Sequence, residues 1–296
     1  MQKSQTIIGN KILGTLSRFY VGKRSRAFGN NRVCTEIPRG NRAILVSVTD
    51  FYPGVQLAKR RGAKRDTKRL HKILYKLGFQ VDVYEDLSAE ETYEVFEAAS
   101  RESVEDCFVG VISSHGEEGL VFGVDGKAVK LAQIFSLFSN PAMDGKTKLF
   151  FVQACRGVDL DPGVETDSAE DDKEDSFSHL LSIPVDSAVV FATSPGYSAF
   201  MHPLGSVFLQ TLCDLLEMEG GQDLEVTQLL TRLNYRVAYG FEARGPQLAG
   251  KKEMPCFVSR LTRQAFPFSL RETGLWGVHQ YLPDEPADEA RRASIR

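Results

Sequence analysis

A cysteine and a histidine each follow a short apolar run, and each has a glycine within two positions. Cys155 lies in FVQACRG, residues 151–157, and His115 lies 40 positions upstream in VISSHGEEG, residues 111–119. A thiolate is a good nucleophile toward a carbonyl carbon, and a histidine can remove the thiol proton and later protonate a leaving amine. Because glycine lets the backbone approach a substrate closely, the N–H groups of Gly116 and Cys155 are candidate oxyanion donors. The pair predicts covalent acyl transfer.

The other cysteines form no pattern typical of a disulfide framework or a zinc site. The chain has five cysteines, an odd number, and no two are spaced as Cys-x-x-Cys. We therefore expect a reducing compartment, no metal and no other cofactor. We interpret Cys107, Cys213 and Cys256 as small buried apolar residues, because their neighbours are apolar. Cys155 differs, because it ends an apolar run and precedes Arg-Gly.

Alternating patterns predict the elements that must position this pair. Strand-like apolar runs and helical periodicities follow one another along the chain. Expected strands are 43–48, 79–84, 108–112, 148–152, 187–192 and 255–261, and expected helices are 64–77, 88–99, 129–138, 205–218 and 223–240. This alternation predicts an α/β fold with a mainly parallel six-stranded sheet and helices on both faces. Such sheets place their sites at the carboxyl ends of strands, where His115 and Cys155 both fall.

Composition narrows the class of protein. The 296 residues are 42% hydrophobic and carry a net charge of -3, which suits one large or two small domains with a real core. No apolar run reaches the roughly 18 residues of a membrane span, and the start lacks a signal-peptide pattern. We therefore expect a cytoplasmic protein with no membrane span. The net charge alone says nothing about nucleic acid, and we expect none among the partners.

Three segments depart from the alternating pattern. In residues 1–40, seven basic residues precede the first acid, Glu36, which indicates a disordered basic arm. A mitochondrial transit peptide is the alternative, since such peptides are also basic, amphipathic and poor in acids. Residues 159–175 carry nine acids and one lysine, so we expect a solvated acidic linker over 159–178. The polar tail, 271–296, is also expected to be disordered.

The two motifs together resemble those of the caspases. Gln-Ala-Cys-Arg-Gly is the family's signature around its nucleophile, with the histidine upstream, and Ser-His-Gly-Glu-Glu-Gly is similar to its histidine segment. The resemblance covers about residues 41–268, and it includes Pro-Gly-Tyr at 195–197 and Lys-Lys-x-x-Pro-Cys at 251–256. The short arm is similar to the prodomain of an executioner caspase, because 40 residues cannot hold a recruitment domain.

The resemblance implies a fold, an activity and an activation step. It implies a caspase-like three-layer sandwich and a cysteine endopeptidase that cleaves proteins after aspartate in apoptosis. An upstream protease would cut the zymogen after Asp167, in Val-Glu-Thr-Asp. The products would be a large subunit, 41–167, with the catalytic pair, and a small subunit, 168–270. Two such pairs would form a homodimer through the last strand.

The resemblance also implies a pocket for the aspartate before the cut, normally built from two arginines and a glutamine. The matching residues here are Arg60 and Gln153. The second arginine is absent, because an ungapped reading from Pro-Gly-Tyr places Met201 at its position and Ala199 and Phe200 just before it. We therefore expect weakened or altered specificity for aspartate, which His202, one residue on, would partly restore when protonated.

Two other functions stay open from the sequence. One is a catalytically weak caspase homologue that acts as a regulatory dimerisation partner, which the defective pocket favours and the intact pair opposes. The other is a different Cys–His acyl transferase, such as an amidotransferase. The acidic linker with its Asp-Ser cut site argues against the second.

Overall fold

A computed structural model describes residues 40–161, 183–246 and 248–270. The chain divides into two units, Met1–Ile37 and Pro38–Arg296, and every described residue belongs to the second. Most of the predicted acidic linker, the basic arm and the tail lie outside the described residues.

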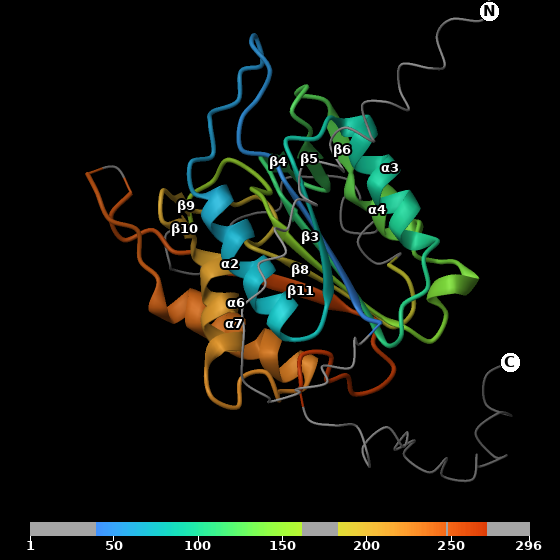
Figure 1. The fold of residues 1–296 in the computed structure, drawn as a ribbon. Coiled ribbons are helices and arrows are strands. Elements are labelled where there is room, and N and C mark those ends of the chain that lie inside the picture. Colours follow the sequence, from blue (N-terminus) through green and yellow to red (C-terminus); the bar gives the residue numbers. More distant parts are fainter. Residues whose placement is uncertain (1–39, 162–182, 247, 271–296) are drawn as a thin grey trace, which may run out of the picture. The chain divides into compact units, whose positions relative to one another are not determined.

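A six-stranded sheet forms the centre of the second unit, with the strand order β11-β8-β7-β3-β1-β2 (Figure 1). The strands are β1 (Arg42–Ser47), β2 (Gln80–Glu85), β3 (Cys107–Ser113), β7 (Thr147–Gln153), β8 (Ser187–Phe191) and β11 (Cys256–Ser259). Neighbours pair in parallel, except that β11 runs antiparallel to β8. The predicted mainly parallel, six-stranded sheet is confirmed.

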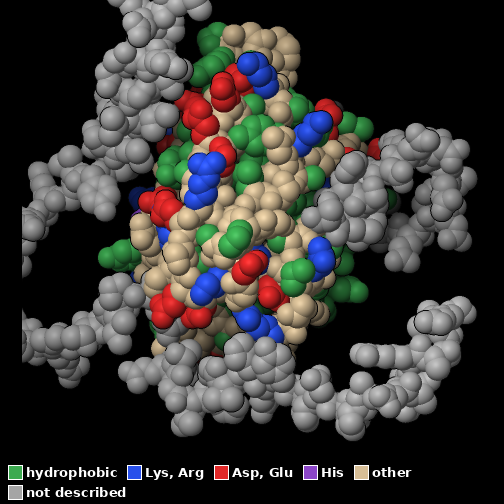
Figure 2. Space-filling model, turned by 90° about the vertical axis from the view of Figure 1, so that its right-hand side faces the viewer, with side chains coloured by type: hydrophobic (Ala, Val, Ile, Leu, Met, Phe, Trp, Pro, Cys, Tyr) green, Lys and Arg blue, Asp and Glu red, His purple; other side chains and the backbone are tan. Residues whose placement is uncertain are grey.

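Helices cover both faces of this sheet (Figure 1). The helices α2 (Ala63–Lys76), α6 (Val207–Glu217) and α7 (Val226–Gly240) lie on one face, and α3 (Ala89–Ser100) and α4 (Leu131–Ser136) lie on the other. The fold is therefore the predicted three-layer sandwich. Figure 2 shows the side on which α3 and α4 lie in Figure 1, with acidic and basic side chains interspersed.

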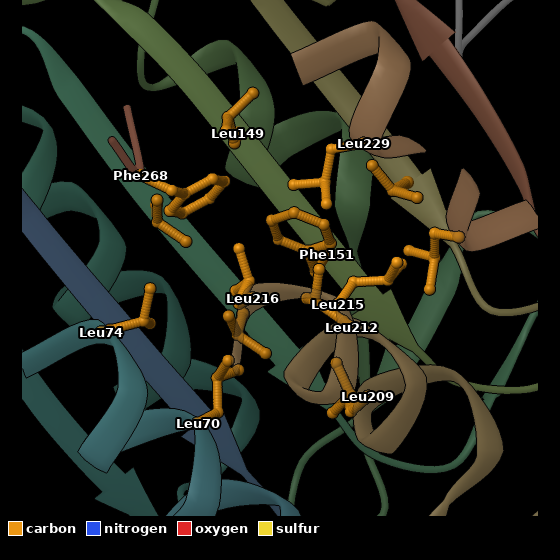
Figure 3. Close-up of a cluster of buried hydrophobic side chains, with 14 of the residues drawn as sticks. Leu70, Leu74, Leu149, Phe151, Leu209, Leu212, Leu215, Leu216, Leu229 and Phe268 are labelled. Carbon is orange, nitrogen blue, oxygen red and sulfur yellow. The ribbon is translucent and has the colours of Figure 1, made fainter. Parts of the chain in front are cut away.

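The sheet separates two hydrophobic cores, because successive side chains of a strand point to opposite faces. On β7, Phe151 packs with α2, α6 and α7, whereas its neighbours Phe150 and Val152 pack with α3 and α4. Figure 3 shows the first core, in which Phe151 lies among leucines from α6 and α7. Strands buried on both faces read as continuous apolar runs, which is why the sequence located them.

Local signals explain the helix ends. Ser88 caps α3 through the predicted capping box, in which Glu91 N–H donates to the Ser88 hydroxyl and the Glu91 carboxylate accepts from Ser88 N–H. The predicted helix 129–138 is wrong in its first residues, because Ala128–Lys130 forms β6 and only Leu131–Ser136 is α4. β6 pairs with β5, a partner that helical periodicity does not reveal.

Short elements that the sequence did not predict surround the strand ends. β4 (Gly116–Glu117), β5 (Leu120–Phe122) and β6 form a three-stranded sheet directly after His115. β9 (Met201–His202) and β10 (Gly205–Ser206) form a two-stranded ribbon before α6, and a 3-10 helix, η1 (Pro141–Met143), precedes β7. Pieces of two or three residues are too short to show a period.

Candidate active site

The register of β3 and β7 brings the predicted pair to one edge of the sheet. Ser113, at the end of β3, pairs with Gln153, at the end of β7. The Ser114 N–H then donates to the Gln153 carbonyl at 3.1 Å. His115 and Cys155 each lie two positions beyond this pair, and both line the same cavity of about 260 Å³. Parallel strands of matched length therefore place the base and the nucleophile together.

A backbone carbonyl fixes the orientation of His115. The His115 Nε2 lies 2.7 Å from the Ala58 carbonyl oxygen. Because a carbonyl only accepts, Nε2 carries the proton of the neutral ring and Nδ1 is the basic nitrogen. Burial lowers the pKa of His115, the Ala58 carbonyl opposes this shift, and the charge of Arg60 lowers the pKa further. A neutral histidine able to take a proton results.

The Cys155 thiol lies against the chain segment that precedes β9. The Ala199 N–H is 3.4 Å from Cys155 Sγ, and the Ala199 carbonyl oxygen is 3.8 Å from it. Gly116 has no room for a side chain, because a Cβ there would lie 2.5 Å from the Leu120 carbonyl oxygen and 3.1 Å from that of Cys155. The backbone of Gly116 therefore lies close to the backbone of Cys155, as expected if both N–H groups donate to one oxyanion.

Arg60 lies buried between the end of β1 and the end of β3. Its side chain is held by hydrogen bonds from Nη1 to the Val48 carbonyl, at 2.6 Å, and from Nη2 to the Ser113 hydroxyl, at 2.9 Å. Burial lowers its pKa to about 10, while Asp66 and Cys155 act in the opposite direction. Arg60 therefore stays charged at neutral pH, and it lines the cavity.

Gln153 and Met201 complete different walls of the cavity. Gln153 is 2% exposed, and its Oε1 has no hydrogen-bond partner among the described residues. Met201 lies close to the start of α2, because a Cβ on Gly62 would be 2.7 Å from Met201 Sδ and 2.0 Å from the His202 carbonyl oxygen. A thioether, not a guanidinium, therefore faces this part of the cavity.

The other two predicted pocket residues separate in space. Ala199 lines the cavity together with His202, whereas Phe200 is not among the lining residues. The Phe200 ring packs against Phe241, with the ring centroids 5.0 Å apart. Its N–H donates at 2.7 Å to Oε2 of Glu253, a carboxyl group with no exposed surface. The segment before β9 is thus attached to a buried acid.

Two charged groups that sequence reasoning missed support the site. Arg156, 3% exposed, donates to both oxygens of Glu118, at 3.0 and 2.6 Å, and its guanidinium lies 4.2 Å over the Phe191 ring. This ion pair ties the residue after Cys155 to the histidine segment. Glu253 is the second group, and burial raises its pKa to about 8. The motifs contain Arg156 and Glu118, but neither their burial nor their pairing can be read from spacing.

The remaining cysteines behave in two ways. Cys107 and Cys213 are buried, as predicted, and burial raises the pKa of the Cys213 thiol to about 12. Cys256 is only partly buried, and its sulfur lies 3.0 Å from Arg156 Nη1. Its surroundings are therefore more polar than predicted. Cys34 and Asp167 lie outside the described residues.

The part of the chain that the structure describes contains neither a cluster suited to a metal ion nor a membrane-spanning helix. Within residues 40–161, 183–246 and 248–270, no three His, Cys, Asp or Glu side chains gather in a way that could hold a metal ion. The same residues contain no helix with the length and apolar character needed to cross a bilayer.

Comparisons with known proteins agree on one family. A family model described as "Caspase domain" matches residues 41–266. Caspase-7 of Gallus gallus is 39% identical over 236 residues, which are 76% of this chain and 76% of that protein. Caspase-3 of Mesocricetus auratus is 35% identical over 239 residues, 78% of this chain and 85% of that protein. The crystal structure of caspase-1 from Spodoptera frugiperda gives a TM-score of 0.69 at 30% identity, and covers 80% of this chain and 93% of that one.

Proposed function

The chain belongs to the caspase family as an executioner-type cysteine endopeptidase of apoptosis, and we propose that it cleaves proteins after aspartate through Cys155 and His115. One observation carries the proposal. The pairing of β3 with β7 places both residues in one cavity, with the charged Arg60 and the side chain of Gln153 in its wall. A nucleophile and a base beside a buried cation suit an anionic peptide substrate.

The reaction follows from the groups in the cavity. The unprotonated Nδ1 of His115 takes the thiol proton, and the Cys155 thiolate attacks the carbonyl carbon of the scissile bond. The carbonyl π electrons move onto oxygen, and the N–H groups of Gly116 and Cys155 donate to this oxyanion. The imidazolium then protonates the leaving amine as the C–N bond breaks, which leaves a thioester. Water, deprotonated by His115, hydrolyses the thioester and restores the thiol.

The cavity determines which residue precedes the cut. A substrate carboxylate loses hydration when it enters, and charge-assisted hydrogen bonds must replace it. Arg60 is already desolvated and held by two hydrogen bonds, so its side chain loses little conformational freedom when a carboxylate binds. The Gln153 side chain lines the cavity, and its NH₂ group is the amide donor that we propose for the carboxylate. Met201 contributes no charge, and we propose weaker selection of aspartate for this reason.

The alternative, a catalytically weak homologue that acts as a regulatory partner, is supported less well than a peptidase. No comparison favours it, and the predicted nucleophile and base share one cavity. The one feature in its favour is Met201, which affects the binding of the aspartate side chain rather than the chemical step.

We also propose the family's activation route for this chain. An upstream protease or a second copy would cut after Asp167, which separates the large subunit, 41–167, from the small subunit, 168–270. Two copies of this large and small subunit pair would then form a homodimer through β11. In the described sheet β11 is an edge strand, because it pairs with β8 alone. An edge strand is a ready template for pairing with another chain. We place the protein in the cytoplasm.

Intact mass spectrometry of the expressed protein tests this proposal. We expect wild type to yield two fragments that separate after Asp167, and Cys155→Ala to remain intact. Addition of wild type to Cys155→Ala should produce the same two fragments, since the cut is made by a functional site. A cut in Cys155→Ala alone, or wild type that never cuts itself or the variant, would contradict the proposal.

A further inference from the structure

A row of exposed basic side chains runs along α2 from the catalytic cavity. Arg65, Lys68 and Lys72 are exposed and are spaced three and four positions apart, so they lie on one face of the helix. Arg61, exposed and just before the helix, belongs to the lining of the cavity itself. From Arg65 to Lys72 the helix rises about 10 Å. Positive charge therefore continues from the cavity along this face.

The same side chains line a second hollow, which we call the α2 basic groove. Its volume is about 340 Å³, and it is lined by Arg65, Lys68, Arg69, Lys72 and Gln210. No acidic residue is among the lining residues. Arg69 is ion-paired with Asp214 and Glu217 of α6, at 2.6 Å each. Within the described part of the chain, Arg65, Lys68 and Lys72 have no such partner.

Some exposed bases elsewhere, such as Lys76 and Lys130, also lack an ion pair in the described structure, but the α2 row places three such bases on one helix face. Several exposed bases elsewhere form ion pairs, including Lys59 with Asp50 and Lys127 with Asp125. Figure 2 shows both signs of charge interspersed on the α3 and α4 side. Like charges three or four positions apart on a helix repel each other and destabilise the helix. Repulsion within the row therefore lowers the stability of α2, and a bound anionic ligand would reduce this repulsion.

We propose that the α2 basic groove is an exosite for an acidic stretch of a protein substrate whose cleaved aspartate occupies the catalytic cavity. This inference rests on the proposed function, because Arg61, in the lining of that cavity, lies four positions before Arg65, in the lining of the groove. An extended peptide advances about 3.3 Å per residue, so three or four residues match the length of the groove. The bases of the groove would pair with acids of the substrate. This would add affinity that the cavity lacks, because Met201 stands there in place of a charged donor.

The shape and surroundings of the groove favour a peptide over a nucleic acid. Asp214 and Glu217 lie on the α6 side, and their carboxylates repel a second row of phosphates. The chain itself contains an acidic segment of the kind that the groove would bind. Residues 168–175, SAEDDKED, follow the proposed cut and carry five acids.

Peptide kinetics test the exosite directly. The first substrate is a short peptide that ends two residues after the cleaved aspartate, the second continues through SAEDDKED, and the third has every acid of that extension replaced by its amide. At low salt we expect the acidic extension to raise kcat/KM of wild type about 3- to 30-fold, mainly through KM, since three exposed pairs each contribute little. The amide extension should have no effect, and 0.5 M salt should remove the gain.

Charge-reversed variants localise the effect. In Arg65→Glu/Lys68→Glu/Lys72→Glu the gain from the acidic extension should disappear, while the short peptide is cleaved as by wild type. The matched control, Arg101→Glu/Lys127→Glu/Lys130→Glu, makes the same charge change on the other side of the sheet and should keep the gain. The single variant Lys68→Gln should lose part of it, which keeps the test informative if the triple variant melts early.

Each result has a distinct meaning. If wild type fails to cleave the short peptide, the proposed function is wrong. If wild type cleaves it but the gain is absent, or is equal in both triple variants, the exosite is wrong and the proposed function stands. Preferential binding of a labelled single-stranded oligonucleotide, lost in the groove variant while the acidic peptide is unaffected, would also overturn the exosite.

Discussion

At the scale of single residues, the site depends on polar atoms that the protein leaves uncommitted. The Nδ1 of His115 is kept free because the Ala58 carbonyl holds the other ring nitrogen, and the Gln153 Oε1 has no partner among the described residues. Arg60 is fixed by Val48 and Ser113 before any substrate arrives. These groups are arranged in advance, so binding requires little reorganisation. Met201 is the exception, because a thioether cannot donate to a carboxylate.

Met201→Arg should improve cleavage after aspartate. A hydrogen bond to a charged group contributes roughly 1.5–3 kcal/mol, so we expect kcat/KM on an aspartate peptide to rise on the order of 10- to 100-fold. The matched asparagine peptide should change little. Leu204→Arg is the control, since it adds the same charge three residues away at a side chain outside the cavity lining. Equal kinetics for wild type and Met201→Arg would show that residue 201 does not contact the substrate carboxylate.

Spacing and motif identified the candidate catalytic residues, but they could not show the surroundings of these residues. His115 and Cys155 were predicted because each follows an apolar run, and the structure brings both to one cavity. The Ala58 carbonyl was not predictable, since any residue type supplies a carbonyl and only the fold decides which one is near. The side-chain position of Phe200 was missed for a similar reason, because its contact with Phe241 links distant segments.

At the scale of elements, buried attachments position the loops that form the cavity. The segment before β9 carries Ala199 beside the thiol, and its Phe200 N–H is bound by Glu253, just before β11. Glu253 has no exposed surface, and its Oε1 has no partner among the described residues. The carboxyl group therefore holds its proton more tightly than usual, with a pKa raised to about 8 by burial.

Glu253 should make stability fall as pH rises. In the unfolded chain this carboxyl loses its proton above its ordinary pKa of 4.5, whereas the folded chain keeps it until about pH 8. Between these values the unfolded state binds fewer protons, so the free energy of unfolding decreases with increasing pH. Glu253→Gln keeps an acceptor for Phe200 but cannot titrate, so its stability should decline less from pH 5 to 8.

Urea unfolding at several pH values measures this difference. Glu242→Gln is the matched control, because Glu242 is an exposed acid beside Lys252 and should leave the pH dependence of wild type unchanged. Parallel stability curves for wild type and Glu253→Gln would mean that Glu253 is ionised in the folded protein.

The long elements were predictable, and the short ones were not. Strands such as β7 are buried on both faces and appear as continuous apolar runs, while α3 begins at a capping box. β4, β5 and β6 are two or three residues long, and their pairing decides their structure rather than their composition. Part of β6 was included in the predicted helix because it runs directly into Leu131–Ser136 and no residue type marks the boundary between them.

At the scale of the whole molecule, the parallel sheet concentrates function at one edge. His115 and Cys155 follow the carboxyl ends of β3 and β7. Arg60, in the loop between β1 and α2, lines the same cavity. α2 begins at this cavity and carries the basic groove away from it. β11 is an outermost strand of the sheet, and we propose that the homodimer forms along it. The three-layer fold followed from the alternation of strands and helices, but the basic groove required knowledge of which charges are paired.

The central claim is that Cys155 cleaves peptides after aspartate, and one measurement tests it most directly. A library of matched peptides, varied only at the residue before the cut, is incubated with wild type and with Cys155→Ala, and the products are identified by mass spectrometry. We predict that wild type cleaves the aspartate peptides most efficiently and that Cys155→Ala cleaves none. Cleavage that persists in Cys155→Ala, or a preference for residues without a carboxylate, would contradict the claim.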